Sequence, residues 1–295
     1  MVTVKILGGL GNQLFEYAFG RAHSLRKNTD LCLDYYYQTM RTDFDGVNLT
    51  RITDIFDLPV KLYVGKKRRK VVKQYGLNYF DYLFFAVYKR TRCFITEDNY
   101  ADSLEKIVKS KNIYVDGYWQ SEQYFANIND IVRDDLRFKI EKDVSSLEVY
   151  KKITQSNSIG IHIRGKDYIN HPWYEALAIK YYIDGINFIS KTNPDFKVFI
   201  FTDDIEHVCK NLKELLSYSE IVKVNSNFNS DAVDLLLMSK CRHNIICNSS
   251  FSWWGAWLNN NSNKIVVAPS RWFKRQSPVD GSKIIPNSWH KIANS

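Results

Sequence analysis

Hydrophobic residues along the chain gather in short runs that alternate with longer stretches of helical spacing. The short runs predict β-strands at 2–7, 31–35, 113–117, 158–163, 197–202, 220–224, 244–248 and 264–269. The longer stretches predict helices near 12–27, 121–137, 173–190, 204–217 and 230–242. Strands that alternate with helices are typical of parallel sheets with Rossmann-like topology. The pattern therefore predicts an α/β protein.

A polar stretch at 139–158 interrupts this alternation and is the best candidate for a domain boundary. We expect two Rossmann-like α/β domains, one over residues 1–150 and one over 151–295. In open α/β sheets, ligands bind at the carboxyl ends of the strands. Polar residues that directly follow a predicted strand are therefore the first candidates for function.

The first such segment is a glycine-rich turn after the strand at 2–7, where Gly8, Gly9 and Gly11 precede a helix. Glycines let a backbone approach a ligand closely, and the amides of a helix N-terminus favour an anion. The dinucleotide fingerprint is incomplete, because Leu14 stands where its third glycine belongs. Asp34 nevertheless ends the next strand, where a dehydrogenase would hold a ribose, so a nicotinamide-dependent oxidoreductase stays open as an alternative.

Two amides follow the glycines, and either of two roles fits them. Asn12 and Gln13 are consistent with an ordinary helix start, but they are also neutral hydrogen-bonding groups that suit a sugar. Glu16, one turn further on, is either a surface position of the helix or a candidate general base.

The strand at 158–163 leads into the segment "HIRGKDY", which contains His162, Arg164 and Asp167. An arginine at the carboxyl end of a strand suits a phosphate group, because it offers a fork of donors and a permanent charge. The alternative is a structural ion pair between an arginine and an aspartate.

Asp203 ends the strand at 197–202 and has two interpretations. It fits the N-cap of the following helix, with Glu206 in the capping-box position, and this is the simpler interpretation. Alternatively its carboxylate accepts hydrogen bonds from a base or a ribose.

The strand at 244–248 leads into "NSSFSWWGAWL", where Asn248, Ser249 and Ser250 stand at a helix N-terminus. Hydroxyl and amide groups in that position suit a phosphate. Trp253 and Trp257 share one face of the helix, and we interpret them as packing residues rather than as a sugar platform.

Charge and cysteine content restrict the partners and the compartment. The net charge of +9 and the basic clusters Lys66–Lys70 and Lys89–Arg92 favour an acidic ligand or an anionic membrane surface. No motif of a nucleic-acid-binding module accompanies them, so we expect no nucleic-acid partner. Five scattered cysteines without metal-ligand spacing indicate reduced thiols. With no signal peptide and no membrane-spanning run, we expect a cytoplasmic protein, peripheral to the inner face of the membrane if the basic clusters bind lipid.

One motif points to a metal ion, and we do not adopt it. Asp43 and Asp45 form the D-x-D pattern that metal-dependent glycosyltransferases use. The pair precedes Gly46 in a predicted turn and does not follow a strand, so we expect no metal there.

Taken in order, these segments resemble the α-1,2-fucosyltransferases of glycosyltransferase family 11, and the resemblance covers nearly the whole chain. The matching segments are "GGLGNQLFEYAFGRA", "DGYWQSEQYF", "HIRGKDY", "FTDDIEHV", "DLLLMSKCRHNIICNSSFSWWGAWLN" and "VVAPSRWF". The chain departs from the family pattern at Gly165 and Lys166, where the family has Arg-Gly.

The resemblance implies a GT-B fold, in which two Rossmann-like domains face each other across a cleft. The N-terminal domain would face the acceptor, and the C-terminal domain would bind the donor, GDP-β-L-fucose. The implied reaction is an inverting, metal-independent transfer to the 2-hydroxyl of a terminal β-galactosyl glycan, in surface polysaccharide or O-antigen biosynthesis. No cofactor beyond the donor substrate is implied.

The family's roles transfer residue by residue. Arg164 would neutralise the leaving diphosphate, and His162 and Asp167 would shape that site. The residues implied in donor binding are Gly9, Gly11, Asn12, Gln13, Asp203, Asn248, Ser249, Ser250 and Phe251. Asp203 would touch the guanosine, whereas Asn12 and Gln13 would face the fucose or the acceptor.

The general base is not singled out by the sequence. Glu16, Asp116 and Glu175 are the additional candidates beside Asp167 and His162. Two other functions stay open: the nicotinamide-dependent oxidoreductase, which predicts NAD(P) binding, and a non-catalytic sugar-binding module, which predicts glycan binding without release of GDP. The sequence indicates no oligomeric state.

Overall fold

The structure is a computed structural model that describes residues 1–35, 50–63, 93–165, 168, 171–192, 194–211, 213–217, 219–221 and 230–294. The chain divides into two compact units, Met1–Arg137 and Phe138–Ser295. The sequence placed the division at 150/151. Residues 138–150 belong to the second unit because side chains such as Val144 pack in the same core cluster as Val233 and Leu237.

The N-terminal unit contains a five-stranded sheet in the order β3-β2-β1-β5-β4, with parallel pairing between all neighbours. Its strands are β1 (Val2–Lys5), β2 (Leu31–Asp34), β3 (Lys61–Tyr63), β4 (Cys93–Thr96) and β5 (Ile113–Asp116). Its helices are α1 (Leu10–Arg26), α3 (Ile52–Ile55), α6 (Tyr100–Lys109) and α7 (Asn129–Asp135), with the 3-10 turns η1 (Glu122–Tyr124) and η2 (Ala126–Ile128).

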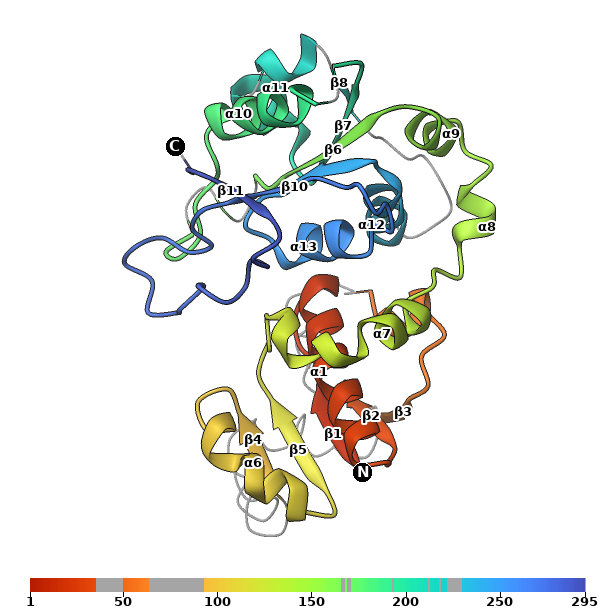
Figure 1. The fold of residues 1–295 in the computed structure, drawn as a ribbon, viewed down its shortest axis with the longest axis vertical. Coiled ribbons are helices and arrows are strands. Elements are labelled where there is room, and N and C mark those ends of the chain that lie inside the picture. The colour runs from red at the N-terminus through yellow and green to blue at the C-terminus, as the bar shows by residue number, and fades with distance from the viewer. Residues whose placement is uncertain are drawn as a thin grey trace, which may run out of the picture. The chain divides into compact units, whose positions relative to one another are not determined.

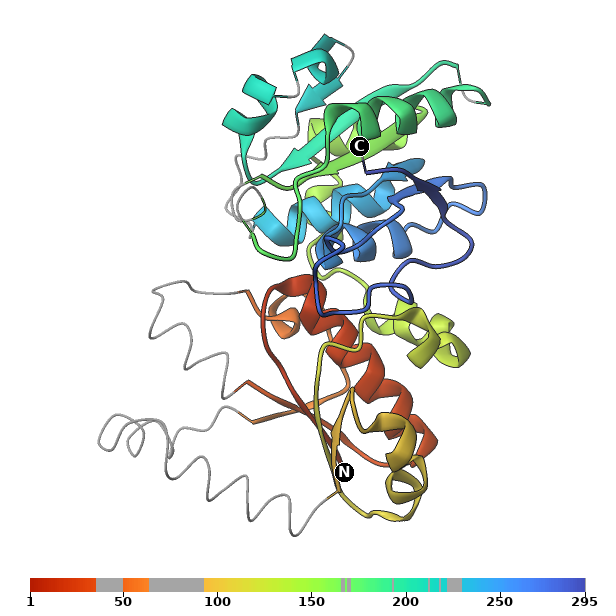
Figure 2. The same ribbon diagram turned by 90° about the vertical axis from the view of Figure 1, so that its left-hand side faces the viewer.

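Helix α1 lies along the sheet (Figure 2), and most of its residues are buried. The close approach depends on Gly20, because a Cβ atom there would stand 2.4 Å from the side chain of Val4 and 2.8 Å from that of Leu31. The buried face carries the large residues Phe15 and Phe19 into the core. The helix predicted near 12–27 is thus confirmed, but it is not a surface helix.

The single helix predicted near 121–137 is wrong. The chain instead makes η1 and η2 before α7 begins. The Ser121 hydroxyl accepts from the Gln123 amide and starts the first turn, and the backbone of Phe125 and Ile128 leaves helical geometry with φ of −133° and −131°. Apolar spacing predicted the buried side but could not show these two breaks.

The C-terminal unit contains a six-stranded sheet in the order β11-β10-β9-β6-β7-β8, again parallel. Its strands are β6 (Ser158–Ile163), β7 (Lys197–Thr202), β8 (Ser219–Ile221), β9 (His243–Ile245), β10 (Val266–Pro269) and β11 (His290–Ile292). Its helices are α8 (Glu141–Val144), α9 (Glu148–Thr154), α10 (Ile179–Ser190), α11 (Ile205–Asn211), α12 (Ser230–Lys240) and α13 (Ser250–Trp257), with the 3-10 helix η3 (Lys213–Ser217).

Hydrophobic cores cover both faces of this second sheet. Along β7, Val198 and Ile200 join the core beneath α10, whereas Phe199 and Phe201 join the core beneath α9 and α12. Successive strand residues point to opposite faces, so this division follows from the alternation. Figure 1 shows α10 on one side of the sheet and α12 and α13 on the other. The α/β prediction is confirmed.

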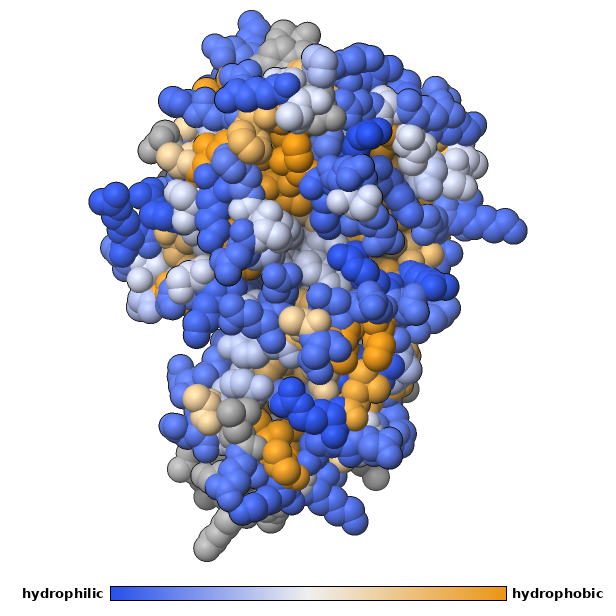
Figure 3. Space-filling model, viewed as in Figure 1, coloured by the Kyte–Doolittle hydropathy of each residue, from blue (hydrophilic) through white to orange (hydrophobic). Residues whose placement is uncertain are grey.

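Three further observations concern the surface, the helices and the cysteines. On the face shown in Figure 3, hydrophobic residues form small separate patches among hydrophilic ones, as on most protein surfaces. None of the helices within the described ranges has the length and apolar character that a membrane crossing requires. All five cysteines are free thiols.

Candidate functional site

The C-terminal sheet has a topological switch point between β6 and β9. From β6 the chain proceeds outward to β7 and β8, and from β9 it proceeds outward in the other direction to β10 and β11. Ligands of open α/β sheets bind outside the carboxyl ends of the strands at such a point. Arg164 follows β6, and the segment 248–251 follows β9. The residues that the sequence predicted to bind phosphate therefore lie on both sides of the switch point.

Arg164 is held by an ion pair at this edge. Its Nη1 atom lies 2.8 Å from Oδ2 of Asp203, which follows the neighbouring strand β7, and the Gly165 amide donates to Oδ1 of Asp203 over 3.2 Å. The guanidinium also lies over the ring of Tyr168, 5.6 Å from its centroid. Both members of the pair are partly exposed. The arrangement fixes a cation at a ligand-binding edge and leaves it accessible to solvent.

Asp203 is not the N-cap of α11, which corrects the simpler of its two interpretations. The cap is Asp204, whose Oδ1 accepts from the His207 amide over 2.9 Å. Both carboxylate oxygens of Asp203 are instead occupied by Arg164 and Gly165. Two adjacent aspartates therefore have different roles: Asp204 caps the N-terminus of α11, and Asp203 orients Arg164.

His162 is buried in β6, and its Nδ1 atom lies 3.2 Å from Sγ of Cys247. Burial, with the nearby charge of Arg164, lowers the pKa of His162 to about 3. A buried imidazole does not reach a substrate, and this low pKa makes it a weak base. We therefore remove His162 from the candidate bases, and its role in shaping the site remains a prediction.

An aromatic group extends from Arg164 toward the surface. Tyr168 stacks on Tyr174 with centroids 4.7 Å apart, and His171 lies against Tyr174 at 4.8 Å. The Nδ1 atom of His171 accepts from the amides of Trp173 and Tyr174, which turns the chain here. Helix α10 consequently begins at Ile179 rather than near 173. Trp173 remains 42% exposed.

Asn248 clamps the entrance of α13. Its Nδ2 group donates to the carbonyls of Glu175 and Trp272, each over 3.2 Å, and the residue is buried. Both amide hydrogens are thereby used, so the side-chain amide has none left for a phosphate. The expected donor role of Asn248 is corrected to a structural one.

Ser249 and Ser250 begin α13, and Ser249 makes no capping hydrogen bond with its hydroxyl. Phe251 packs beside His162, with ring centroids 5.4 Å apart. The first turn of α13 therefore presents backbone amides and hydroxyls at the edge where Arg164 lies. Trp253 and Trp257 are buried, and the Trp253 indole donates to the Ile284 carbonyl over 2.8 Å, which confirms that they are packing residues.

Glu175 belongs to a hydrogen-bond network near the C-terminus. Its Oε1 accepts from Arg271 over 3.3 Å and from Asn294 over 2.7 Å. A carboxylate with these two partners holds the 271–294 segment against the loop before α10. This structural role replaces the expectation of a general base.

Helix α12 carries two carboxylates that the sequence analysis did not select, and one of them interacts with the Arg164–Asp203 pair. Asp231, in the first turn of α12, interacts electrostatically with both members of the pair. Asp234 lies one turn further along, and burial with the charge of Asp231 raises its pKa from 3.8 to about 7. No described donor reaches the Asp234 carboxyl group. The sequence signal for these two residues is a pair of aspartates three positions apart at the start of a helix. Acidic residues are common there for ordinary helix stabilisation, so the pattern does not single out a site.

At the corresponding edge of the N-terminal sheet, the side-chain amide of Gln13 makes all of its hydrogen bonds within the protein. Its Nε2 donates to the carbonyls of Gly8 and Thr50, and its Oε1 accepts from the Ile52 amide over 3.2 Å. Gln13 is fully buried and has no group left for a sugar, so its expected ligand role is corrected.

The neighbours of Gln13 in the glycine turn differ in accessibility. Gly9 is exposed, and no atom lies within 4 Å of where its Cβ would stand. Gly11 is buried in the first turn of α1. Oδ1 of Asn12 accepts from the Gln120 side chain over 2.8 Å. The ligand roles predicted for these three residues remain predictions.

Three carboxylates, of Glu16, Glu97 and Asp116, gather at this edge. Glu16 is buried, not on the surface, and accepts from the Leu7 amide over 3.0 Å. Burial raises the pKa of Glu16 well above its ordinary value. Glu97 accepts from the Trp119 amide over 2.6 Å, and Asp116 pairs with Lys5 over 3.0 Å. Only Asp116 of the three has a partly exposed carboxylate paired with a cation.

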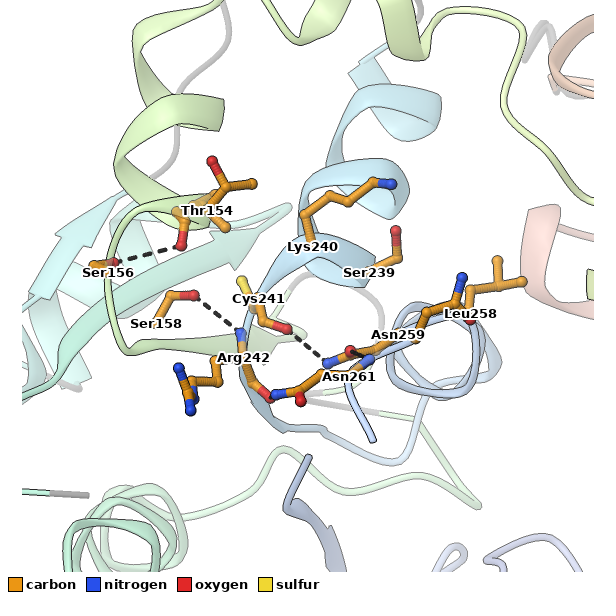
Figure 4. A pocket seen from close by; sticks show the side chains of 12 residues that line it. Thr154, Ser156, Ser158, Ser239, Lys240, Cys241, Arg242, Leu258, Asn259 and Asn261 are labelled. Carbon is orange, nitrogen blue, oxygen red and sulfur yellow. Dashed lines mark hydrogen bonds between the residues drawn. The ribbon is translucent and has the colours of Figure 1, made fainter. Parts of the chain in front are cut away.

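A hollow in the described part of the second unit lies at the opposite edge of the sheet (Figure 4). It has a volume of about 330 Å³, and its lining includes Ser158 at the amino end of β6 and Arg242 just before β9. The C-terminal ends of α9, α12 and α13 converge on it, where the helix dipoles disfavour an anion. The hollow does not coincide with the residues that the sequence predicted to bind phosphate.

Some predicted features lie outside the described residues: Asp167, Lys166, the Asp43–Asp45 pair and the basic clusters Lys66–Lys70 and Lys89–Arg92. Within the described ranges, no three His, Cys, Asp or Glu side chains stand close enough together to hold a metal ion.

Comparison with known proteins gives consistent matches. The family model "Glycosyl transferase family 11" matches residues 58–293. An α-1,2-colitosyltransferase from Escherichia coli is 32% identical and covers 99% of both chains, and the O-antigen biosynthesis glycosyltransferase WbnK from Escherichia coli is 30% identical over 96% of this chain and 97% of its own. A galactoside 2-α-L-fucosyltransferase from Caenorhabditis elegans is 23% identical over 90% of this chain and 71% of its own.

Among solved structures, the fucosyltransferase NodZ from Bradyrhizobium has a TM-score of 0.53. The match covers 86% of this chain and 90% of that one at 14% identity, which shows the fold alone. The chain thus has the GT-B architecture.

Proposed function

The chain belongs to glycosyl transferase family 11, and we propose that within this family it transfers L-fucose from GDP-β-L-fucose to the 2-hydroxyl of a glycan acceptor. The proposed reaction inverts the anomeric carbon and needs no metal ion. The acceptor we propose is a terminal β-galactoside in surface polysaccharide or O-antigen assembly, in keeping with the names of the relatives. The observation that carries the proposal is the Arg164 guanidinium, held by Asp203 at the switch point of the C-terminal sheet.

Arg164 supplies the charge that the leaving group needs. As the bond between fucose and diphosphate breaks, negative charge develops on the β-phosphate, and a preorganised guanidinium stabilises it without reorganisation. Ser249, Ser250 and the first amides of α13 add hydrogen-bond donors for the same diphosphate. Asp203 acts as a positioning residue, because both of its oxygens hold the Arg164–Gly165 segment.

Asp234 is our candidate for recognition of the base. Guanine presents two adjacent N–H donors, and a carboxylate can accept from both. Asp234 interacts electrostatically with Asp231, and Asp231 interacts with Arg164 and Asp203. Asp234 therefore takes the guanosine role that the sequence analysis gave to Asp203.

Asp116 is our candidate for the general base on the acceptor side. Glu16 and His162 are buried, and Glu175 lies in the C-terminal unit, to which we assign the donor. Asp116 ends β5 with a partly exposed carboxylate beside Lys5. A base there would take the proton of the acceptor hydroxyl as the new glycosidic bond forms.

The test is a calorimetric titration of the intact chain in EDTA with GDP, GDP-fucose, UDP and NADH, followed by a transfer assay with lactose. We expect guanine-nucleotide binding, no binding of UDP or NADH, and an α-1,2-linked product by NMR. NADH binding would favour the oxidoreductase, and glycan binding without GDP release would favour the sugar-binding module. Because one relative is named a colitosyltransferase, GDP-colitose is the second donor to compare.

We also propose a peripheral site of action at anionic lipid. The net charge of +9 supports it. Flotation with vesicles of anionic and of zwitterionic lipid tests this part separately. Equal flotation with both would contradict the membrane proposal and leave the proposed reaction unaffected.

A further inference from the structure

The N-terminal sheet has its own topological switch point, between β1 and β5. From β1 the chain proceeds to β2 and β3 on one side, whereas β4 and β5 lie on the other. Two loops follow the strands there, the turn at 7–9 and the loop at 117–120. The Gln120 side chain donates to Oδ1 of Asn12 over 2.8 Å and joins them. A ligand of this unit would contact both loops.

The loop at 117–120 holds an unfavourable backbone conformation. Trp119 has a φ of 54°, the left-handed region that a bulky residue rarely adopts. Such a conformation costs roughly 1–3 kcal/mol and persists only where the surroundings impose it. Its fully buried indole stacks on Phe19, with ring centroids 3.8 Å apart.

Glu97 is the group that imposes this conformation from the polar side. Its Oε1 accepts from the Trp119 amide over 2.6 Å. Burial raises the pKa of Glu97, while hydrogen bonds from the amides of Trp119 and Tyr118 oppose the rise. A partly buried carboxylate is thus devoted to holding two consecutive backbone groups of one short loop.

This arrangement leaves the side chain of Tyr118 exposed on a loop whose other residues are held in place. Its neighbours are fixed by Lys5, Glu97 and Asn12, yet its own side chain is 40% exposed. An aromatic ring with a hydroxyl offers an apolar face for the C–H groups of a sugar ring and a polar handle for its hydroxyls. Strain that displays one exposed ring beside a switch point indicates a binding function rather than a folding one.

We propose that Tyr118 contacts the sugar ring of the acceptor glycan and sets acceptor affinity, with Glu97 as the positioning residue that holds the loop. The inference deepens the proposed function and rests on it for the identity of the acceptor. It assigns these two residues to acceptor binding and not to donor binding or to the chemical step.

The first test measures binding directly, so that it does not depend on transfer. Lactose and N-acetyllactosamine are titrated against the wild type, Tyr118→Ala and Tyr118→Phe, with saturation-transfer NMR as the readout. We expect Tyr118→Ala to weaken binding about tenfold, the loss of one good aromatic contact of about 1.4 kcal/mol, and Tyr118→Phe to retain most of it. Ile131→Ala is the matched control, because Ile131 is 39% exposed in the same unit.

Equal binding by the wild type and Tyr118→Ala would overturn the proposal, and so would a wild type that binds neither glycan. Failure of the proposed function appears elsewhere, as absence of GDP binding or of transfer. In the transfer assay, Tyr118→Ala is expected to raise the acceptor KM with kcat and the affinity for GDP unchanged. A fall in kcat alone would place Tyr118 in the chemical step and contradict the assignment.

The second test addresses Glu97. Glu97→Ala is expected to raise the acceptor KM as Tyr118→Ala does, and Glu97→Gln to restore it, because the amide oxygen still accepts from the Trp119 N–H. If Glu97→Ala does not fold, Glu97→Gln and Tyr118→Ala still test the proposal. Glu97→Ala with a lowered Tm and an unchanged acceptor KM would reduce Glu97 to a structural residue.

Discussion

The two units use polar side chains differently at equivalent edges of their sheets. In the N-terminal unit, Gln13, Glu16 and Glu97 direct their groups at backbone amides and carbonyls of the loops beside them. In the C-terminal unit, Arg164 stays partly exposed, and Asp234 meets no described donor. A polar residue after a strand is therefore not by itself a ligand-binding group. The two cases differ in the partner, which is the loop backbone for Gln13, Glu16 and Glu97 and a charged side chain for Arg164.

The comparison separates effects on activity from effects on folding, and the largest effect is expected at Arg164. Arg164→Ala should lower kcat/KM roughly 10²–10³-fold, as for the loss of one oxyanion donor. Release of GDP measures the rate, and thermal unfolding serves as the control because the side chain is partly exposed. Arg164→Lys keeps the positive charge but loses the forked guanidinium, so its kcat/KM should lie between those of the wild type and Arg164→Ala. Activity of Arg164→Ala within tenfold of the wild type would contradict the role.

In the N-terminal unit the expected loss is one of stability. Glu16→Ala leaves the Leu7 amide without its acceptor and should reduce the free energy of unfolding by about 1–3 kcal/mol. Glu16→Gln keeps an acceptor and should cost much less. Chemical denaturation of both variants provides the measurement.

The pH dependence of Glu16 sharpens this prediction. Its folded pKa is raised above the ordinary 4.5, so the folded state loses stability relative to the unfolded state as pH rises from 4.5 through the folded pKa. Glu16→Gln cannot ionise and should gain stability relative to the wild type over that rise. A constant difference across the range would show that the carboxyl group ionises normally.

The adjacent aspartates of the C-terminal unit repeat the comparison within two residues. Asp204→Ala removes the cap of α11 and should cost about 0.5–2 kcal/mol of stability. Asp203→Asn should leave Tm nearly unchanged but reduce kcat/KM about tenfold, because Arg164 loses its charged partner. Measuring Tm and kcat/KM for both variants tests this prediction. The reverse pattern would mean that the two roles are exchanged.

The smallest effect is expected at Asp234. Burial and Asp231 raise its pKa to about 7, so the wild type loses stability as pH rises from 3.8 to about 7. Asp234→Asn should therefore melt higher than the wild type at pH 8 by at least the roughly 2–4 °C that 1 kcal/mol produces, with little difference at low pH. The same variant should bind GDP more weakly. Unchanged GDP affinity would remove Asp234 from the donor site.

The sequence predicted the alternation of strands and helices and most strand positions, because buried parallel strands are apolar runs. It missed β3, β4 and β11, which are short strands at or near the sheet edges with few buried side chains. It also placed α10 too early, since no local pattern shows that His171 turns the chain by bonding two amides.

For the candidate site, the sequence predicted the positions of residues at strand ends better than it predicted their hydrogen-bond partners. Arg164 and Ser249 lie at the switch point as the strand-end rule predicts. Gln13, Asn248 and Glu175 were misassigned because their partners are 24 to 119 residues away in the chain or are backbone groups. Whether an amide is free or committed is a property of tertiary packing, which residue type does not encode.

The exposure of Trp173 gives the protein a built-in optical probe. Six of the seven tryptophans are buried, and Trp173, next to the aromatic group that leads to Arg164, is 42% exposed. A soluble quencher such as iodide should therefore act on the emission of this one indole. Occupancy of the adjacent site could then be followed by fluorescence in the unmodified chain, without a label.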